Sequence, residues 1–146
     1  MSRIQLALNV PDLDAAVNFY SKLFDAQPSK RHPGYANFAI SQPPLKLVLF
    51  ENIHAPSSIN HLGVEVDSAE EVQAATHRFA TEGLVTDLKE STDCCYALQD
   101  KVWVTGPDEA RWEFYVVHAD TDGSVPDGCT TNTADRSGLS PDLCCT

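Results

Sequence analysis

Hydrophobic and polar residues alternate in two segments of the chain. In residues 4–10 the even-numbered positions are aliphatic and form one face of a predicted strand, whereas the odd-numbered positions, starting with Gln5, form the other face. Residues 61–66 repeat this arrangement, with His61 at the start of the more polar face. Superposition of the two segments places His61 on Gln5. We expect two related strands whose aliphatic faces are the buried ones.

A helix is predicted after each of these strands. Asp12 opens a segment in which apolar residues recur at helical spacing up to Phe24. In the second half, Ser68 and Glu71 have the spacing of a capping box, and Gly83 is typical of a helix end. The succession of strand and helix therefore occurs twice.

Further strands complete a repeat. They are predicted at residues 35–40 and 45–50, with a weaker strand at 28–32, and at residues 84–89, 96–99, 101–105 and 112–117. The pattern predicts an α+β fold of two βαβββ modules, about residues 1–55 and 56–118. We expect their curled mixed sheets to enclose a shared cleft.

The composition changes after His118. Residues 119–146 are rich in Asp, Ser, Thr, Gly and Pro and contain few large apolar side chains. Such a segment cannot bury enough apolar surface to be held on the domain, so we expect a flexible C-terminal tail. This tail carries three of the five cysteines, Cys129, Cys144 and Cys145.

Composition and charge narrow the functional classes. The chain has 146 residues, of which 42% are hydrophobic, enough for one domain with its own core. Its net charge of −11 argues against nucleic acid or an anionic membrane as a partner. No apolar run reaches the roughly 18 residues of a membrane span. The N-terminal residues lack the pattern of a secretory signal, so we expect a cytoplasmic protein.

The other two cysteines, Cys94 and Cys95, are adjacent. Consecutive Cα atoms lie about 3.8 Å apart, which is closer than an ordinary disulfide allows. In a reducing compartment the pair is therefore expected to be two thiols, which are more often catalytic or metal-binding than structural.

Three polar residues are candidates for a metal centre in the cleft. Gln5 and His61 occupy equivalent positions on equivalent strands, and Glu113 lies on the inner face of the last predicted strand. A lone histidine is more often structural than a ligand, and a strand-edge glutamate is usually solvated. The matching repeat positions favour a metal site, because a buried carboxylate needs a cationic partner. Imidazole, carboxylate and amide ligands would leave coordination positions open for chemistry.

These motifs resemble those of the vicinal oxygen chelate superfamily, which contains glyoxalases, extradiol dioxygenases and antibiotic-resistance proteins. The resemblance covers residues 1 to about 118 and rests on residues 9–13, 61–64 and 106–115. Within the superfamily, Cys94 and Cys95, together with a cysteine-bearing tail, are similar to the C–As lyases (organoarsenical demethylases) and the cadmium-induced proteins.

This resemblance implies an enzyme that uses Fe(II) and O2 to break the carbon–arsenic bond of trivalent organoarsenicals, such as methylarsenite or aromatic arsenicals, with release of arsenite. It implies Gln5, His61 and Glu113 as metal ligands, and Cys94 and Cys95 as arsenic-binding thiols. Gln5 replaces the more usual His, which lowers metal affinity and leaves other divalent metals open.

Glyoxalases with Gln at this position differ from this chain because they have a fourth metal ligand. They add it from the first module, and its expected equivalent here is the apolar Leu47. Glu51 is acidic but lies four residues farther on, past the predicted strand. A site with three ligands favours oxygen chemistry over isomerisation.

Adjacent thiols suit trivalent arsenic, which is soft and has two exchangeable positions when it carries one carbon. Because neighbouring residues of a strand point to opposite faces, chelation by Cys94 and Cys95 requires a turn or an irregular loop. A small buried structural pair stays the alternative. Aromatic residues expected either to line the pocket or to pack in the core are Tyr96, Trp103 and Tyr115. The remaining histidines, expected to be structural or exposed, are His32, His54, His77 and His118.

Other functions stay open. The thiols can sequester arsenite or cadmium without catalysis, or the chain can be a glyoxalase-like lyase or transferase for which the Cys94–Cys95 pair is incidental. The tail cysteines can pass arsenic to the pair or complete a product site. We expect a monomer or a homodimer, since two modules can close one cleft within a chain or between two chains.

Overall fold

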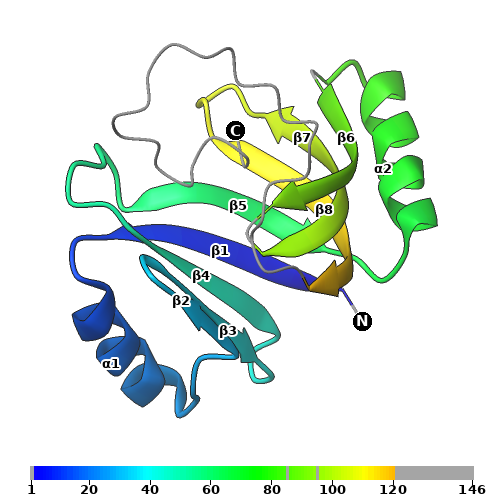
Figure 1. Cartoon of the computed structure of the whole chain (residues 1–146). Helices are drawn as coiled ribbons and strands as arrows, with labels where there is room; N and C mark the ends of the chain where they lie inside the picture. Colours follow the sequence, from blue (N-terminus) through cyan, green and yellow to red (C-terminus); the bar gives the residue numbers. More distant parts are fainter. Residues whose placement is uncertain (1, 85, 95, 121–146) are drawn as a thin grey trace, which may run out of the picture.

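The computed structural model describes residues 2–84, 86–94 and 96–120. They form one eight-stranded mixed sheet in the order β2-β3-β4-β1-β5-β8-β7-β6, with two helices (Figure 1). The elements are β1 (Arg3–Val10), α1 (Leu13–Phe24), β2 (Lys30–His32), β3 (Tyr35–Ile40), β4 (Leu45–Glu51), β5 (Ile59–Glu65), α2 (Ala69–Thr81), β6 (Thr86–Cys94), β7 (Ala97–Thr105) and β8 (Arg111–Asp120). The α+β class and the repeated βαβββ order are confirmed. Neither helix is long and apolar enough to cross a membrane.

The two halves have the same strand pairing. β1 pairs with β4 in parallel, and β5 pairs with β8 in parallel. An antiparallel pairing of β1 with β5 joins the halves at the middle of the sheet, which places Gln5 opposite Gly63 and Ala7 opposite His61. The equivalent first strands of the two modules therefore lie side by side (Figure 1).

Both helices start at the predicted caps. The Asp12 carboxylate accepts a hydrogen bond from the Ala15 amide at 3.1 Å. Ser68 Oγ accepts from the Glu71 amide at 3.3 Å, and the Glu71 carboxylate in turn accepts from the Asp67 amide at 2.8 Å. The contacts of the Ala15 and Glu71 amides satisfy donors that the first helical turn leaves without a partner. The apolar sides of α1 and α2 pack on one face of the sheet.

Several strand boundaries differ from the sequence prediction. The strand predicted at 84–89 starts at Thr86 and continues to Cys94 as β6. The segments 96–99 and 101–105 form the single strand β7, because Asp100 continues the pairing with β8. The weaker strand at 28–32 is present as β2. Residues 119 and 120, predicted to start the tail, still belong to β8, where they pair with the first residues of β7. The rest of the predicted tail, with its three cysteines, lies outside the described residues.

The more polar face of β1 and β5 is the more deeply buried one, contrary to the sequence-based expectation. Ala7, Gln5 and His61 are 0%, 4% and 4% exposed, whereas Ile4 on the aliphatic face is 47% exposed. The reason is that the sheet curls on itself. The ring of Tyr96, in the turn after β6, stacks on the ring of His32 in β2 with centroids 3.7 Å apart, so the two edges of the sheet meet. The inner face is therefore enclosed.

Candidate metal centre

Three central strands bring the predicted ligands together on the enclosed face. The Gln5 amide nitrogen lies 2.6 Å from Glu113 Oε1 and 3.1 Å from His61 Nε2. His61 Nε2 lies 3.2 Å from Glu113 Oε1. Gln5 comes from β1, His61 from β5 and Glu113 from β8, in neighbouring strands. The convergence of these side chains is thus a structural fact, and their role as metal ligands stays a prediction.

The hydrogen bonds of His61 determine which of its ring nitrogens is free to accept. Asn60 Nδ2 donates to Asn9 Oδ1 at 3.0 Å, so the oxygen of the Asn60 amide faces His61 Nδ1, at 2.7 Å. An oxygen can only accept, and Nδ1 therefore carries the hydrogen. In its neutral form His61 then presents an Nε2 lone pair toward the Gln5 amide, with Glu113 Oε1 3.2 Å away. This is the arrangement in which histidine binds metals.

Lys101 provides a buried cation for the same carboxylate. Its ammonium lies 3.1 Å from Glu113 Oε2, and both side chains are almost fully buried. Burial alone would raise the pKa of Glu113, but the charge of Lys101, a hydrogen bond with His61 and the charge of a protonated His61 outweigh it and lower the pKa to about 2 from an ordinary value of 4.5. Glu113 is therefore ionised, with Oε2 held by Lys101 and Oε1 directed to the centre.

Tyr115 orients the amide of Gln5. Its hydroxyl donates a short hydrogen bond to Gln5 Oε1 and lies 3.1 Å from Glu65 Oε2. Burial, and next the negative charge of Glu65, raise the pKa of Tyr115 well above its ordinary value, so the hydroxyl keeps its proton. The amide NH2 of Gln5 is thereby directed at His61 and Glu113.

The side chains of Gln5, His61 and Glu113 are suitable ligands for a divalent cation. The two N–H bonds of the Gln5 amide are shared between a lone pair of His61 and a carboxylate oxygen of Glu113, so the amide holds two electron-rich atoms together as a cation would. A cation would require the amide to turn its oxygen inward. The Tyr115 hydroxyl can then accept the N–H, because its own hydrogen can go to Glu65. The surrounding cavity of about 10 Å³ has room for roughly one water-sized particle.

The predicted pocket aromatics lie around this centre. The Trp103 ring meets His61 edge-on at 5.2 Å, and Phe50 lies on another side of the imidazole at 6.4 Å. Tyr115 is part of the centre itself, as described above. Tyr96 lies farther out, where it stacks on His32 and meets the Tyr35 ring at a tilt, with centroids 5.0 Å apart. His118 forms an ion pair with Asp100 at 2.9 Å, away from the cluster.

The first of the two adjacent cysteines lies at the end of β6, next to the turn that leads to β7. Cys94 is the last residue of β6 and pairs with Ala97, whereas Cys95 lies outside the described residues. Tyr96 has a φ of 64°, and Lys30 Nζ donates to its carbonyl at 3.0 Å. The end of this hairpin therefore contacts the first module across the enclosed face. Arsenic binding by the pair stays a prediction.

The expectation about Leu47 was wrong by one residue. Leu47 pairs with Leu6 and packs in the core beneath α1, on the face opposite the cluster. The inward-facing residues of β4 are Lys46, Val48 and Phe50, and Lys46 lies opposite Gln5. A shift of one position in a strand reverses the face, so Leu47 points away from the cluster. Glu51 accepts from the Leu13 amide at 2.8 Å at the start of α1, and has no part in the centre.

Two lysines of the enclosed face, Lys46 and Lys101, were missing from the residues predicted from sequence. Lys101 shares its parity with Trp103 in a strand whose alternate residues, Val102 and Val104, pack toward α2. A lysine at such an inward position is the signal that could have identified it.

Gly63 allows β5 and β8 to approach at the centre. A Cβ at this position would lie 3.0 Å from Glu113 Cγ and 3.1 Å from the Glu113 carbonyl oxygen. We expect Gly63→Ala to displace Glu113, to destabilise the fold by about 1–3 kcal/mol and to weaken metal binding. Gly34→Ala is the matched control, because Gly34 has a φ of 73° but no atom near its Cβ position. It should cost about 1–2 kcal/mol of backbone strain and leave metal affinity unchanged. Equal metal affinity in all three proteins would contradict the role of Gly63.

Acid should destabilise the metal-free protein through Glu113. Its pKa is about 2 in the folded chain and near 4.5 otherwise, so the unfolded chain binds more protons in this range. The contribution of the ionised group, about 3 kcal/mol, is complete above pH ~4.5 and is lost as the pH falls toward 2. Urea unfolding between pH 3 and 7 measures it. The double variant Lys101→Met/Glu113→Gln should show a flatter pH dependence, and an unchanged slope would contradict the assignment.

Comparison with known proteins agrees with the fold and identifies the family. The sequence model of the glyoxalase/bleomycin resistance protein/dioxygenase superfamily matches residues 3–114. The cadmium-induced protein CadI of Mycobacterium tuberculosis is 55% identical over 147 residues, covering 99% of this chain and 93% of the relative. The trivalent organoarsenical cleaving enzyme of Thermomonospora curvata is 56% identical over 123 residues, covering 84% and 82% of the two chains.

Solved structures with the same fold are more distant in sequence. An extradiol ring-cleaving dioxygenase from B. fuscum has a TM-score of 0.62 at 19% identity, with 82% of this chain and 34% of that chain covered. The Mn(II)-bound glyoxalase from Novosphingobium aromaticivorans has a TM-score of 0.60 at 18% identity, with 83% and 42% covered. These likenesses concern the fold. Together with the sequence relatives, they show that the chain belongs to the glyoxalase, bleomycin resistance protein and dioxygenase superfamily, alongside the CadI proteins and the trivalent organoarsenical cleaving enzymes.

Proposed function

We propose that this protein cleaves the carbon–arsenic bond of trivalent organoarsenicals, with Fe(II) bound by Gln5, His61 and Glu113 and with O2 as the second substrate. The observation that carries the proposal is the buried meeting point of an imidazole, a carboxylate and an amide. The relatives named as organoarsenical cleaving enzymes support the substrate class. Other divalent metals can occupy the same ligands in vitro.

Neighbouring residues orient the side chains of the proposed ligands. Asn60 fixes His61 with its Nε2 lone pair inward, and Lys101 holds one oxygen of Glu113 so that the other is available. Ferrous iron, when bound, supplies the open coordination positions at which O2 is activated. The rings of Trp103 and Phe50 pack around the imidazole of His61. The positive charge of Lys101 balances the negative charge of the ionised Glu113. The three ligand side chains and Lys101 together therefore carry no net charge.

In this proposal Cys94 and Cys95 bind the arsenic atom. Two thiolates match the two exchangeable positions of a monosubstituted trivalent arsenical. The end of β6 contacts the first module through Lys30 and the Tyr96 carbonyl, which supports a position over the enclosed face. Arsenic binding needs free thiols, as the reducing cytoplasm would maintain them. Binding both reactants on one scaffold provides orientation, which is a large part of the rate of such a reaction.

The test is turnover under controlled oxygen. Protein loaded with Fe(II) under anaerobic conditions is mixed with methylarsenite, with and without O2, and released arsenite is measured. We expect arsenite only when iron and O2 are both present. Release without either one would disprove the oxygen-dependent mechanism, although carbon–arsenic cleavage would stand.

A binding protein without catalysis is the second candidate, favoured by the similarity to cadmium-induced proteins. It predicts stoichiometric capture of arsenite or Cd²⁺ by Cys94 and Cys95 and no arsenite release from methylarsenite. The variants Cys94→Ser and Cys95→Ser distinguish the two functions. The enzyme should lose turnover and keep iron binding, whereas the binding protein should lose only metal or metalloid capture.

A further inference from the structure

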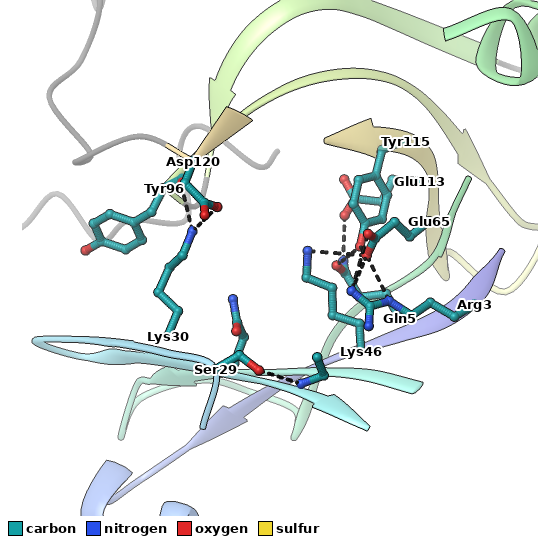
Figure 2. Close-up of polar contacts among 12 residues, drawn as sticks. Arg3, Gln5, Ser29, Lys30, Lys46, Glu65, Tyr96, Glu113, Tyr115 and Asp120 are labelled. Carbon is teal, nitrogen blue, oxygen red and sulfur yellow. Dashed lines mark hydrogen bonds and ion pairs between the residues drawn. The ribbon is translucent and has the colours of Figure 1, made fainter. Parts of the chain in front are cut away.

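A second, larger cavity lies next to the candidate metal centre. Its volume is about 200 Å³, and its lining includes Arg3, Lys30, Lys46, Glu65 and Ala97. Lys46 also lines the small cavity around the metal centre. Figure 2 shows Lys46 with Arg3 and Glu65 beside Gln5 and Glu113, and Lys30 apart from them, pointing toward Asp120 and Tyr96. The two cavities therefore have one side chain in common.

The cavity also reaches the hairpin that carries the cysteines. Ala97, in its wall, is the pairing partner of Cys94. Lys30 donates to the Tyr96 carbonyl in the same turn and forms an ion pair with Asp120 at 2.6 Å (Figure 2). The wall of this cavity thus contains Lys46, which also lines the small cavity of the metal centre, and Ala97, the backbone pairing partner of Cys94. This is where the organic group of a bound arsenical would lie.

The charges of this cavity are unusual for so acidic a chain. Its wall carries three cations and two carboxylates, one positive charge in excess, on a chain with a net charge of −11. Arg3 neutralises Glu65 through hydrogen bonds of 3.1–3.3 Å. Lys30 is neutralised by Asp120.

Of the three cations in the cavity wall, Lys46 has the charge that is least balanced by a carboxylate. Among the described residues, its nearest carboxylate is Glu65 at 3.5 Å, which already binds Arg3. The Lys46 side chain is only 13% exposed, and its ammonium stands 5.1 Å from the centre of the Tyr115 ring. Burial lowers the pKa of Lys46, and the charge of Glu65 offsets this only in part. An ammonium has three N–H donors, so Lys46 can bind a further acceptor in the cavity.

We propose that this cavity receives the organic group of the arsenical and that Lys46 binds an anionic substituent on that group. A cavity of about 150 Å³ can hold a benzene ring, so 200 Å³ accommodates one ring with a small substituent. The substrate class is therefore aryl arsenicals in the trivalent state with a carboxylate on the ring. This inference rests on the proposed function for the position of arsenic, but the anion site can be tested without arsenic.

The first experiment measures binding of benzoate and of its neutral analogue benzamide to the protein by calorimetry. We expect benzoate to bind better than benzamide, and Lys46→Gln to weaken benzoate by about tenfold to a hundredfold. Lys46→Arg should retain most of the affinity, and Lys22→Gln, at an exposed position on α1, is the matched control. Equal binding of benzoate and benzamide to the unmodified protein would overturn the proposal whatever the variants do. Unchanged benzoate affinity in a folded Lys46→Gln variant would do the same.

The second experiment compares turnover of 4-carboxyphenylarsenite and phenylarsenite. The ratio of their kcat/KM values should exceed one in the unmodified protein and should fall at least about tenfold in Lys46→Gln. Benzoate binding without cleavage of any arsenical would refute the proposed function and retain the anion site. Cleavage of both arsenicals at a ratio that does not respond to Lys46 would refute the anion site and retain the proposed function.

Discussion

Replacing His61 with Ala is expected to lower the affinity for Fe(II) by about a hundredfold or more, since even loss of a residue that only supports a ligand costs tenfold to a hundredfold. Arsenite release should fall below detection in the same variant. The fold should persist, because the ion pair of Glu113 with Lys101 does not depend on the imidazole. Iron binding is measured anaerobically by titration, and folding by circular dichroism.

His118→Ala is the control for this experiment. His118 also contacts a carboxylate, that of Asp100, but lies outside the cluster and is partly exposed. It should retain iron affinity and turnover. An His61→Ala variant that binds iron as well as the unmodified protein would show that the cluster is a structural hydrogen-bond network rather than a metal centre.

Replacing Lys101 with Met is expected to lower the free energy of unfolding by about 3–5 kcal/mol, because it leaves the carboxylate of Glu113 buried without its cation. Both side chains are inaccessible to water, so solvent cannot compensate for the loss. The double variant Lys101→Met/Glu113→Gln should recover most of this loss, since it removes both charges together. Urea unfolding of metal-free protein at pH 7 measures all three values.

Lys89→Met is the matched control, because Lys89 lies directly opposite Lys101 on β6. Its side chain is 43% exposed and its ammonium pairs with an exposed Asp87, an interaction worth about 0–1 kcal/mol. We expect a change within that range. Equal destabilisation by Lys101→Met and Lys89→Met would contradict the buried pair. Bound Fe(II) should in turn reduce the cost of Lys101→Met, since a cation at Glu113 Oε1 supplies part of the missing charge.

The sequence predicted the part of the site that follows from the repeat. Gln5 and His61 could be matched because each begins the polar face of a first strand, and the structure brings both to Glu113. Lys101 could not be assigned in this way. Strand alternation places it inward, but only the curl of the sheet determines which carboxylate its long side chain reaches.

The error at Leu47 has the same origin. Alignment of two modules fixes which strands are equivalent, but a difference of one residue in a strand exchanges the inner and outer faces. Lys46, rather than Leu47, faces the cluster for that reason. The greater burial of the polar face could not be predicted from the sequence either. The hydrophobicity of the residues does not reveal that the sheet edges meet through Tyr96 and His32.

The pairing of β1 with β5 makes the centre a property of the whole chain. Gln5 and Glu113 are 108 residues apart, so their contact closes nearly the longest loop that the domain contains. An ion bound by both residues would hold the two halves of the domain together. The unfolded chain has no equivalent binding site for it. At a free metal concentration a hundred times the dissociation constant, this linkage adds about 2.7 kcal/mol of stability. Cellular iron supply would then set the lifetime of the protein as well as its activity.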